Sequence, residues 1–294
     1  MSSSASSPLS KARLKGPVQV PTGGRIFPVH IARTRRDLEA ARQLDNLVFG
    51  AARGVTAQEM QEVARCGYVL LLWGGDSGLI GQSRVVVAPT SQYPQLASDE
   101  AYCSGTAVHP QYRGYGFGRI LARAQETCAR HHQKERMSLL VRPENGRSIR
   151  MRLALGFHIV GYAPLAFAHR EGERGGRLRM EKSLVLGMLP PPPWLLVRLL
   201  EAGDVLLVND TDRLAHALAQ AQPLAIPVQP GDDSPESVDD AAARALLEHL
   251  FRQPYMGIGL LRPEEHGLPF PPPGKNLLVF WPKERIKEVV RLLS

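Results

Sequence analysis

Apolar residues recur along the chain with two different spacings. Short apolar runs between Gly, Pro, Ser or Asp predict strands, whereas apolar residues three or four positions apart predict helices. In residues 25–187 these patterns predict, in order, a strand at 25–32, helices at 34–49 and 56–64, strands at 67–73, 79–87 and 102–108, a helix at 118–131, a strand at 138–141, a helix at 145–155, and strands at 157–167 and 178–185. This succession predicts an α/β fold.

The pattern changes at residues 188–194, which include four consecutive prolines. Such a run favours an extended polyproline II linker over a helix or a central strand. Beyond it, the patterns predict a smaller α/β domain, with strands at 204–209, 224–228, 255–261 and 276–281 and helices at 210–220, 234–252 and 282–293.

Residues 1–24 are rich in Ser, Pro and Lys and lack the apolar segment of a secretory signal, so we predict a disordered leader. The predicted plan is therefore a leader at 1–24, a first domain at 25–187, a linker at 188–194 and a second domain at 195–294. The longest apolar runs are far shorter than the roughly 20 residues that span a bilayer, so we predict no membrane span.

The composition is that of a globular protein, since 44% of the 294 residues are hydrophobic, and the length suffices for two cores. Cys66, Cys103 and Cys128 are widely spaced in apolar surroundings. This favours reduced core thiols in a cytoplasmic protein over a disulfide framework, although a catalytic role for Cys103 is an alternative. Asp210 and Asp212 could suggest a metal or phosphoacceptor site, but we interpret them as a helix cap and predict no metal.

The charge is unevenly distributed along the chain. The 36 Lys and Arg and 28 Asp and Glu residues give a net charge of +8. Residues 1–190 hold 26 basic and 14 acidic residues, for +12, and residues 191–294 hold 10 and 14, for −4. A basic first domain can attract a phosphate-bearing ligand or an acidic protein, while a solvated basic face is the plainer interpretation.

A glycine-rich turn, Arg113-Gly114-Tyr115-Gly116-Phe117-Gly118, joins the predicted strand 102–108 to the predicted helix 118–131. Glycines lack the β-carbons that keep a ligand away from the backbone, so successive N–H groups can face one anion at a helix N-terminus. Arg113 adds a positive charge. The turn therefore predicts a pyrophosphate-binding site.

A dinucleotide-binding fingerprint also places glycines between a strand and a helix. It requires an acidic residue about 20 residues further on, at the end of the next strand. Here the next predicted strand ends in Arg142, and only Glu135 lies in the segment before it. The sequence therefore disfavours a dinucleotide-dependent dehydrogenase.

Residues 108–118 instead resemble the acyl-CoA-binding signature of the GNAT superfamily of N-acyltransferases, with Gln111 standing three positions before the first glycine. A second block, Asn145, Ser148, Met151 and Gly156-Phe157, is similar to the family's next motif at the family's spacing. The resemblance covers about residues 26–187. One position departs from the pattern: Arg152 stands where the family commonly has a Tyr that protonates the leaving thiolate.

The resemblance implies a GNAT-like mixed sheet flanked by helices, with acetyl-CoA or another acyl-CoA as co-substrate and no metal. It also implies that the parallel strands 102–108 and 138–141 splay apart, so that the pantetheine arm pairs with their backbones, and that amides near Ala107 and Val108 polarise the thioester carbonyl. Asn145 would bind the pantetheine, cap its helix, or do both. The implied donor-binding residues are Ala107, Val108, Arg113, Gly114, Tyr115, Gly116, Phe117, Gly118, Arg119 and Asn145.

The attacking amine must lose a proton to a base near the thioester. Strict alternation along the strand would place Tyr102, Ser104, Thr106 and Val108 on one face together with Glu100. Glu100, acting through a water, and Tyr102 are therefore the predicted bases. An exposed loop position for Glu100 is the alternative.

The departing thiolate must in turn gain a proton. Arg152 cannot supply it, since an arginine pKa lies above about 12. Arg152 could stabilise the thiolate, bind a CoA phosphate or face solvent, and Tyr162 or water would then be the acid.

We therefore predict an N-acyltransferase that transfers an acyl group, first of all acetyl from acetyl-CoA, to a primary amine by direct attack. Two alternatives are an enzyme that uses long-chain acyl-CoA or acyl carrier protein, and a noncatalytic acyl-CoA sensor. The predicted partners are a small-molecule or protein amine, an acyl carrier protein, and a second copy of the chain through the C-terminal domain; the scattered basic residues disfavour nucleic acid. Since every implied donor residue precedes the linker, we expect a chain ending near Pro190 to bind CoA.

Overall fold

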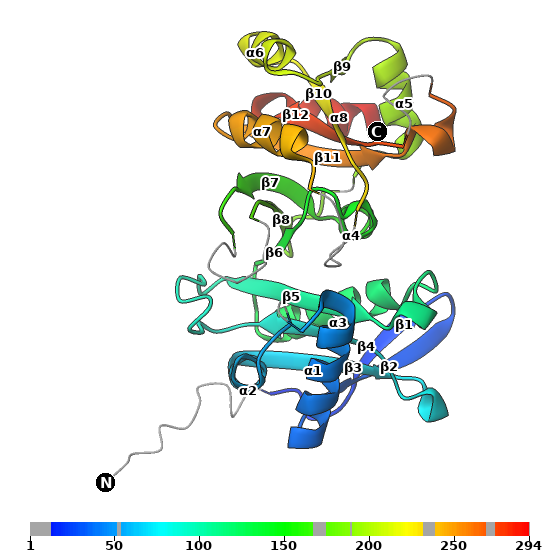
Figure 1. The fold of residues 1–294 in the computed structure, drawn as a ribbon, viewed down its shortest axis with the longest axis vertical. Coiled ribbons are helices and arrows are strands. Elements are labelled where there is room, and N and C mark those ends of the chain that lie inside the picture. The colour runs from blue at the N-terminus through cyan, green and yellow to red at the C-terminus, as the bar shows by residue number, and fades with distance from the viewer. Residues whose placement is uncertain are drawn as a thin grey trace. The chain divides into compact units, whose positions relative to one another are not determined.

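The computed structural model describes residues 13–51, 54–166, 175–188, 190–231, 239–268 and 274–293. The chain divides into two compact units, Met1–Leu139 (unit 1) and Leu140–Ser294 (unit 2). The division falls within strand β6 (Arg136–Val141). Figure 1 shows strands and flanking helices in both units.

Unit 1 contains a mixed sheet. Its strands follow one another across the sheet in chain order and are β1 (Val18–Thr22), β2 (Arg25–Ile31), β3 (Gly67–Trp73), β4 (Leu79–Val86), β5 (Glu100–Val108) and the start of β6. Neighbouring strands are antiparallel, except that β5 and β6 are parallel. The predicted mixed sheet and α/β class are therefore confirmed.

The helices of unit 1 begin where the sequence predicts. They are α1 (Arg35–Phe49), α2 (Ala57–Cys66) and α3 (Phe117–His131), with short 3₁₀ turns η1 (Gly75–Ser77) and η2 (Pro110–Tyr112). Thr34 and Thr56 each form a capping box with the acidic residue three positions on, so both ends of the interaction satisfy backbone N–H groups.

Strand β1 contradicts the prediction of a disordered leader over its last residues. Val18 and Val20 are buried, and β1 pairs with β2 through a turn at Gly23-Gly24, whose φ values are 55° and 75°. Two glycines with positive φ between alternating residues are a hairpin signal, and the neighbouring prolines obscured it. Residues 1–12 of the predicted leader lie outside the described residues.

The strands of unit 2 also form a mixed sheet. Its strands are β7 (His158–Ala163), β8 (Arg177–Ser183), β9 (Leu206–Leu207), β10 (Leu224–Val228), β11 (Tyr255–Leu261) and β12 (Asn276–Pro282), in the spatial order β8-β7-β11-β12-β10-β9, and β8 is the neighbour of β6. Its helices are α4 (Gly146–Leu153), α5 (Pro193–Glu201), α6 (Thr211–Ala219), α7 (Ala241–Leu250) and α8 (Ile286–Leu293), with 3₁₀ turns η3 (Pro263–His266) and η4 (Lys283–Arg285). Only β9 and β10 form a parallel pair among the pairs described here.

The sheet of unit 2 continues across the predicted linker. Strand β7 precedes the linker and β11 follows it, yet the two pair at Ile159 and Gly257. A β-carbon on Gly257 would lie 2.7 Å from Ile159 Cβ, so glycine permits this close approach. The segments before and after the prolines thus share one sheet, whereas the sequence predicted separate domains.

Helix α5 begins inside the predicted linker. Pro193 is its first residue, a position where proline's missing N–H removes no helical hydrogen bond. Leu196 and Leu200 join a core with Val279, Trp281 and other residues. Their helical spacing was present in the sequence, but the proline run before them masked it.

Helix α8 also packs within unit 2. Val289 is 2% exposed and belongs to the core, against which Ile286 packs. The apolar side of α8 is thus at least partly buried inside the unit.

Candidate functional site

The glycine turn has the backbone that the sequence predicts for an anion-binding site. Gly114 has φ 91°, and Gly116, the N-cap of α3, has φ 83° and ψ 2°. A β-carbon built at either glycine would meet nothing within 4 Å, so conformation, not crowding, requires glycine there. None of the side chains that the structure describes caps α3, which leaves its first N–H groups available to a ligand.

Charged and aromatic side chains around the turn reach solvent. Arg113, Tyr115 and Arg119 are all exposed, Tyr115 to 75%. The Arg113 Nε lies 3.4 Å from the carbonyl oxygen of Val108, which ties the turn to the end of β5. Two guanidinium groups therefore flank the N-terminus of α3, where the helix dipole also favours an anion.

Strand β5 loses its parallel partner partway along. It pairs with β6 only at Glu100, Ala101 and Tyr102, opposite residues 136–138. The described pairing of β5 from residue 103 onward is with β4. The predicted parallel pairing is confirmed, and the described pairing with β6 ends at Tyr102.

One of the two predicted carbonyl-binding amides points away from β4. His109 N donates to Ile80 O of β4 at 2.9 Å. Because N–H groups alternate in direction along a strand, the Ala107 N–H points toward β4 and the Val108 N–H points away from it. Val108 is therefore the better placed amide.

A β-bulge in β5 overturns the predicted face of the strand. The register with β4 shifts between Gln82, opposite Ala107, and Arg84, opposite Ser104. Gly105, with φ 49°, lies in the extra length of β5. The bulge puts Ala107 on the face of Ser104 and Tyr102, and puts Val108 on the opposite face, because an inserted residue reverses the alternation.

A buried polar cluster covers this bulge. Arg84 is 8% exposed, and its Nη2 lies 3.1 Å from Asp45 Oδ1 of α1. The same carboxylate accepts from Gln82 Nε2 at 2.8 Å and from Val55 N at 2.9 Å. A β-carbon on Gly105 would overlap the Arg84 guanidinium, so the cluster and the bulge fit only with glycine.

We expect Gly105→Ala to destabilise the protein by about 2–4 kcal/mol, because it adds backbone strain and displaces a buried ion pair. Gly75→Ala is the matched control, since Gly75 has φ 63° but open space around its β-carbon. Strain alone should cost about 1–2 kcal/mol there. Equal losses in urea unfolding would show that the Arg84 contact contributes nothing.

Glu100 and Tyr102 lie at the paired end of β5. Glu100 is 8% exposed and accepts from Ser138 Oγ, while Arg136 Nη2 lies 3.1 Å from its Oε2. The alternative of an exposed loop residue is therefore wrong. Tyr102 is also 8% exposed and stacks on Tyr93 with ring centroids 4.2 Å apart.

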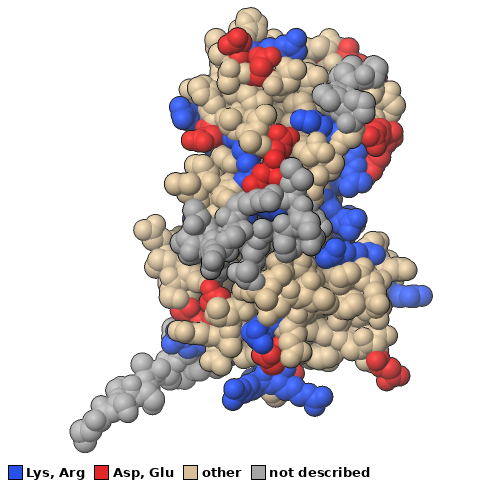
Figure 2. All heavy atoms as spheres, viewed as in Figure 1, with Lys and Arg blue, Asp and Glu red and all other residues tan. Residues whose placement is uncertain are grey.

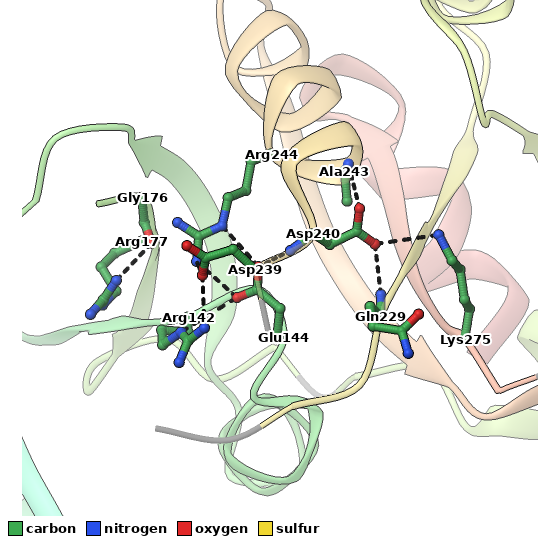
Figure 3. Close-up of polar contacts among 10 residues, drawn as sticks. All are labelled: Arg142, Glu144, Gly176, Arg177, Gln229, Asp239, Asp240, Ala243, Arg244 and Lys275. Atoms are coloured by element: carbon green, nitrogen blue, oxygen red, sulfur yellow. Dashed lines mark hydrogen bonds and ion pairs between the residues drawn. The ribbon is translucent and has the colours of Figure 1, made fainter. Parts of the chain in front are cut away.

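Asn145 caps α4, accepting from Ser148 N at 3.0 Å, as one of its two predicted roles requires. The loop before it is buried and charged: Arg142 is 1% exposed and Glu144 is fully buried. Figure 3 shows that both side chains meet the N-terminal end of α7. Sequence reasoning missed these residues, whose partners lie about 100 positions further along the chain.

The two predicted residues for the leaving thiolate differ in their surroundings. Arg152 is 4% exposed and its guanidinium lies 5.4 Å from the centre of the Phe157 ring, so the predicted alternative of a solvated side chain is wrong. Tyr162 hydrogen-bonds Arg244. Burial raises the pKa of the Tyr162 hydroxyl, Arg244 lowers it, and Glu144 and Glu248 raise it, with a net increase.

The remaining predicted features are structural. Cys103 and Cys128 are buried core thiols, Cys66 is partly buried, and none of the three forms a disulfide. Burial raises the pKa of Cys128 to about 12. Asp210 caps α6 by accepting from Arg213 N at 2.8 Å, as predicted. Among the described residues, no group of three or more His, Cys, Asp or Glu side chains could hold a metal ion, and no helix is long and apolar enough to cross a membrane.

Charges of both signs are mixed on the surface of unit 2. Figure 2 shows acidic and basic side chains next to one another on its visible face. Arg150 and Arg262 both pair with Glu265, at 2.8 and 3.0 Å. Part of the basic excess of residues 1–190 is thus neutralised by the acidic C-terminal sequence.

The region of this chain that matches a known protein family includes the glycine turn. Solved structures similar to this chain include a ribosomal-protein-S18-alanine N-acetyltransferase from Escherichia coli (19% identity, 54% of this chain and 95% of that chain, TM-score 0.41) and a GCN5-related N-acetyltransferase from Kribbella flavida (18% identity, 54% and 98%, TM-score 0.42). No curated protein matches the chain. The family model described as "Acetyltransferase (GNAT) family" matches residues 38–157. Residues 38–157 are therefore a GNAT acetyltransferase domain.

Proposed function

We propose that the protein transfers an acetyl group from acetyl-CoA to a primary amine by direct attack on the thioester. The observation that carries this proposal is the left-handed turn at Gly114 and Gly116, placed between strand β5, whose described pairing with β6 ends at Tyr102, and the N-terminus of α3. Such a turn suits a pyrophosphate, and a strand that parts from its parallel neighbour suits the amides of a pantetheine arm.

In the proposed reaction the amine nitrogen attacks the thioester carbonyl carbon, and the carbon–sulfur bond then breaks. The Val108 N–H stabilises the negative charge on the carbonyl oxygen, an interaction whose removal typically costs about 3 kcal/mol. The amine loses its proton to water, because Glu100 and Val108 are the two ends of β5, roughly 25 Å apart at the rise of a strand, which is too far for one water to connect them. Arg136 and Ser138 hold the Glu100 carboxylate at the paired end of the strand.

Coenzyme A leaves as a thiolate and must be protonated. We propose Tyr162 or water as the acid, because Tyr162 keeps its proton at neutral pH. Arg152 packs on Phe157 and is not the acid. Its position as a buried cation leaves thiolate stabilisation as its proposed role.

Transfer of longer acyl groups, from CoA or from an acyl carrier protein, is the alternative enzymatic function. The replacement of the family's Tyr by Arg152 also favours a noncatalytic acyl-CoA sensor as a second candidate. We also propose that the protein works in a reducing cytoplasm, because its three cysteines form no disulfide. A homodimer through the C-terminal domain is a further proposal.

Thiol release by the full chain, measured with acetyl-CoA and a panel of amino acids, polyamines and peptide N-termini, tests the proposal. We expect at least one amine to raise thiol release about tenfold or more above hydrolysis, because positioned reactants gain a large effective concentration. Thiol release with longer acyl-CoAs but not with acetyl-CoA would support the long-chain alternative instead. Tight acetyl-CoA binding with no amine-dependent release would support the sensor.

A further inference from the structure

We propose that Arg244, in the C-terminal part of the chain, is a positioning residue for acyl transfer that holds both the Asn145 loop and Tyr162 in place. This inference rests on the proposed function. It gives the C-terminal sequence a role in placing Asn145 and Tyr162.

Glu144 is held in place by hydrogen bonds from Arg244, Asp240 and Gly231. Arg244 donates to both of its carboxylate oxygens, from Nε at 2.8 Å and from Nη2 at 3.0 Å, and Asp240 N donates at 3.0 Å. Gly231 N donates to the Glu144 carbonyl at 2.7 Å. Figure 3 shows Glu144 facing Arg244 and the first residues of α7. Two parallel charge-assisted hydrogen bonds fix orientation as well as distance.

Residues at the same end of α7 also bind Arg142, at the start of the loop that leads to Asn145. Asp239 Oδ1 accepts from Arg142 Nη2 and from Arg244 Nη2, each at 2.8 Å. Arg142 Nε lies 3.6 Å from Glu144 Oε2. Arg142 and Glu144 thus have carboxylate and guanidinium partners from residues 239–244, and both are almost without solvent contact.

Backbone hydrogen bonds connect Arg142 and Glu144 to Asn145 and to the residue that follows it. Asn145 N donates to Arg142 O at 3.0 Å, and Gly146 N donates to Glu144 O at 2.8 Å. The Asn145 side-chain oxygen is used in capping α4, so its orientation follows that of the loop and the helix. A shift of Glu144 would therefore move Asn145.

Tyr162 lies at the other side of Arg244. A β-carbon on Gly176 would overlap the Tyr162 hydroxyl and lie 2.6 Å from Arg244 Nη1, so both groups pack against the bare glycine. Gly176 has φ 86°, which itself favours glycine. Arg244 thus contacts Tyr162 and Glu144 at once, and it is 12% exposed.

Arg244→Lys in the full chain is the first test, because lysine keeps the charge but cannot form the two-pronged interaction with Glu144. Arg252→Lys is the matched control, since Arg252 follows α7 and is 65% exposed. We expect Arg244→Lys to lower kcat by about 10- to 100-fold through misplacement of reacting groups, and Arg252→Lys to leave it unchanged.

Calorimetry with CoA and with adenosine 3′,5′-diphosphate provides a readout that does not need turnover. The diphosphate lacks pantetheine and therefore does not engage Asn145. We expect Arg244→Lys to bind CoA about fivefold more weakly, the loss of roughly one hydrogen bond, and to bind the diphosphate as the wild type does.

Glu144→Gln is the second variant, because it keeps the shape of the side chain and removes its charge. It should show the same selective loss of CoA affinity. Arg244→Lys or Glu144→Gln protein that is folded, with wild-type affinity for CoA, would overturn the inference, and so would equal weakening of both ligands. Wild-type protein that binds CoA but acetylates no amine would reject the proposed function, while the two-ligand comparison still decides the role of Arg244.

Discussion

Replacing Gly116 by Asp should weaken CoA binding by about 100-fold or more while the protein stays folded. Gly116 has φ 83°, so any side chain adds strain of about 1–2 kcal/mol. The carboxylate would also stand where the pyrophosphate is proposed to bind, at the N-terminus of α3, and two like charges repel strongly in such close contact. Titration calorimetry with CoA measures the change.

Two controls separate the causes of this loss. Gly116→Ala adds strain without charge and should cost far less affinity than Gly116→Asp. Gly78→Asp adds the same side chain at another open glycine, with φ 76°, and should leave CoA binding unchanged. A folded Gly116→Asp protein with wild-type CoA affinity would show that the pyrophosphate binds elsewhere.

A chain ending at Pro190 should fail to fold in its second half and should lose CoA binding. The deletion removes Asp239 and Arg244, which leaves Arg142 and Glu144 as charges without those partners. Removing one partner of a buried ion pair typically costs about 3–5 kcal/mol, comparable to the whole stability of many domains. It also removes β11, the neighbour of β7.

Circular dichroism and CoA calorimetry check this expectation. A chain that begins at Arg13 is the control, since it removes a terminal segment of the opposite end and should keep CoA affinity. The sequence analysis predicted that the chain ending near Pro190 would bind CoA, and the contacts within unit 2 reverse that expectation. If the chain ending at Pro190 were soluble and bound CoA with wild-type affinity, the domain boundary predicted at the proline linker would be correct.

Helix caps and the glycine turn could be predicted from the sequence, because the residues that stabilise them are neighbours in the chain. Thr34 and Thr56 mark helix starts because a hydroxyl and a carboxylate three positions on satisfy free backbone N–H groups. The glycine turn was predicted for a similar reason, because alternating glycines permit positive φ next to a helix. Such signals also exist at Gly23-Gly24 and Leu195-Leu196, where nearby prolines led to the wrong prediction.

Features that depend on distant residues were not predictable in this way. The bulge at Gly105 changed which residues share a face of β5, and the fit of Gly105 depends on Arg84 and Asp45, which lie on other elements. Gly105 inside the strand pattern was a possible bulge signal, but the sequence alone does not show whether a bulge forms there. A single inserted residue reverses every later side-chain direction, so an error there propagates along the strand.

The sequence by itself therefore determined the helix caps and the glycine turn, since each is encoded by residues close together in the chain, and two short motifs at the family's spacing gave the GNAT resemblance that the family model places at residues 38–157. Only the tertiary structure decided which amide of β5 points away from β4, that Glu100 is buried with Arg136, and that Arg244 holds the loop before Asn145. These depend on burial and on contacts between residues far apart in the chain. The free energy that selects them comes from desolvated charges and packed surfaces, which no local pattern records.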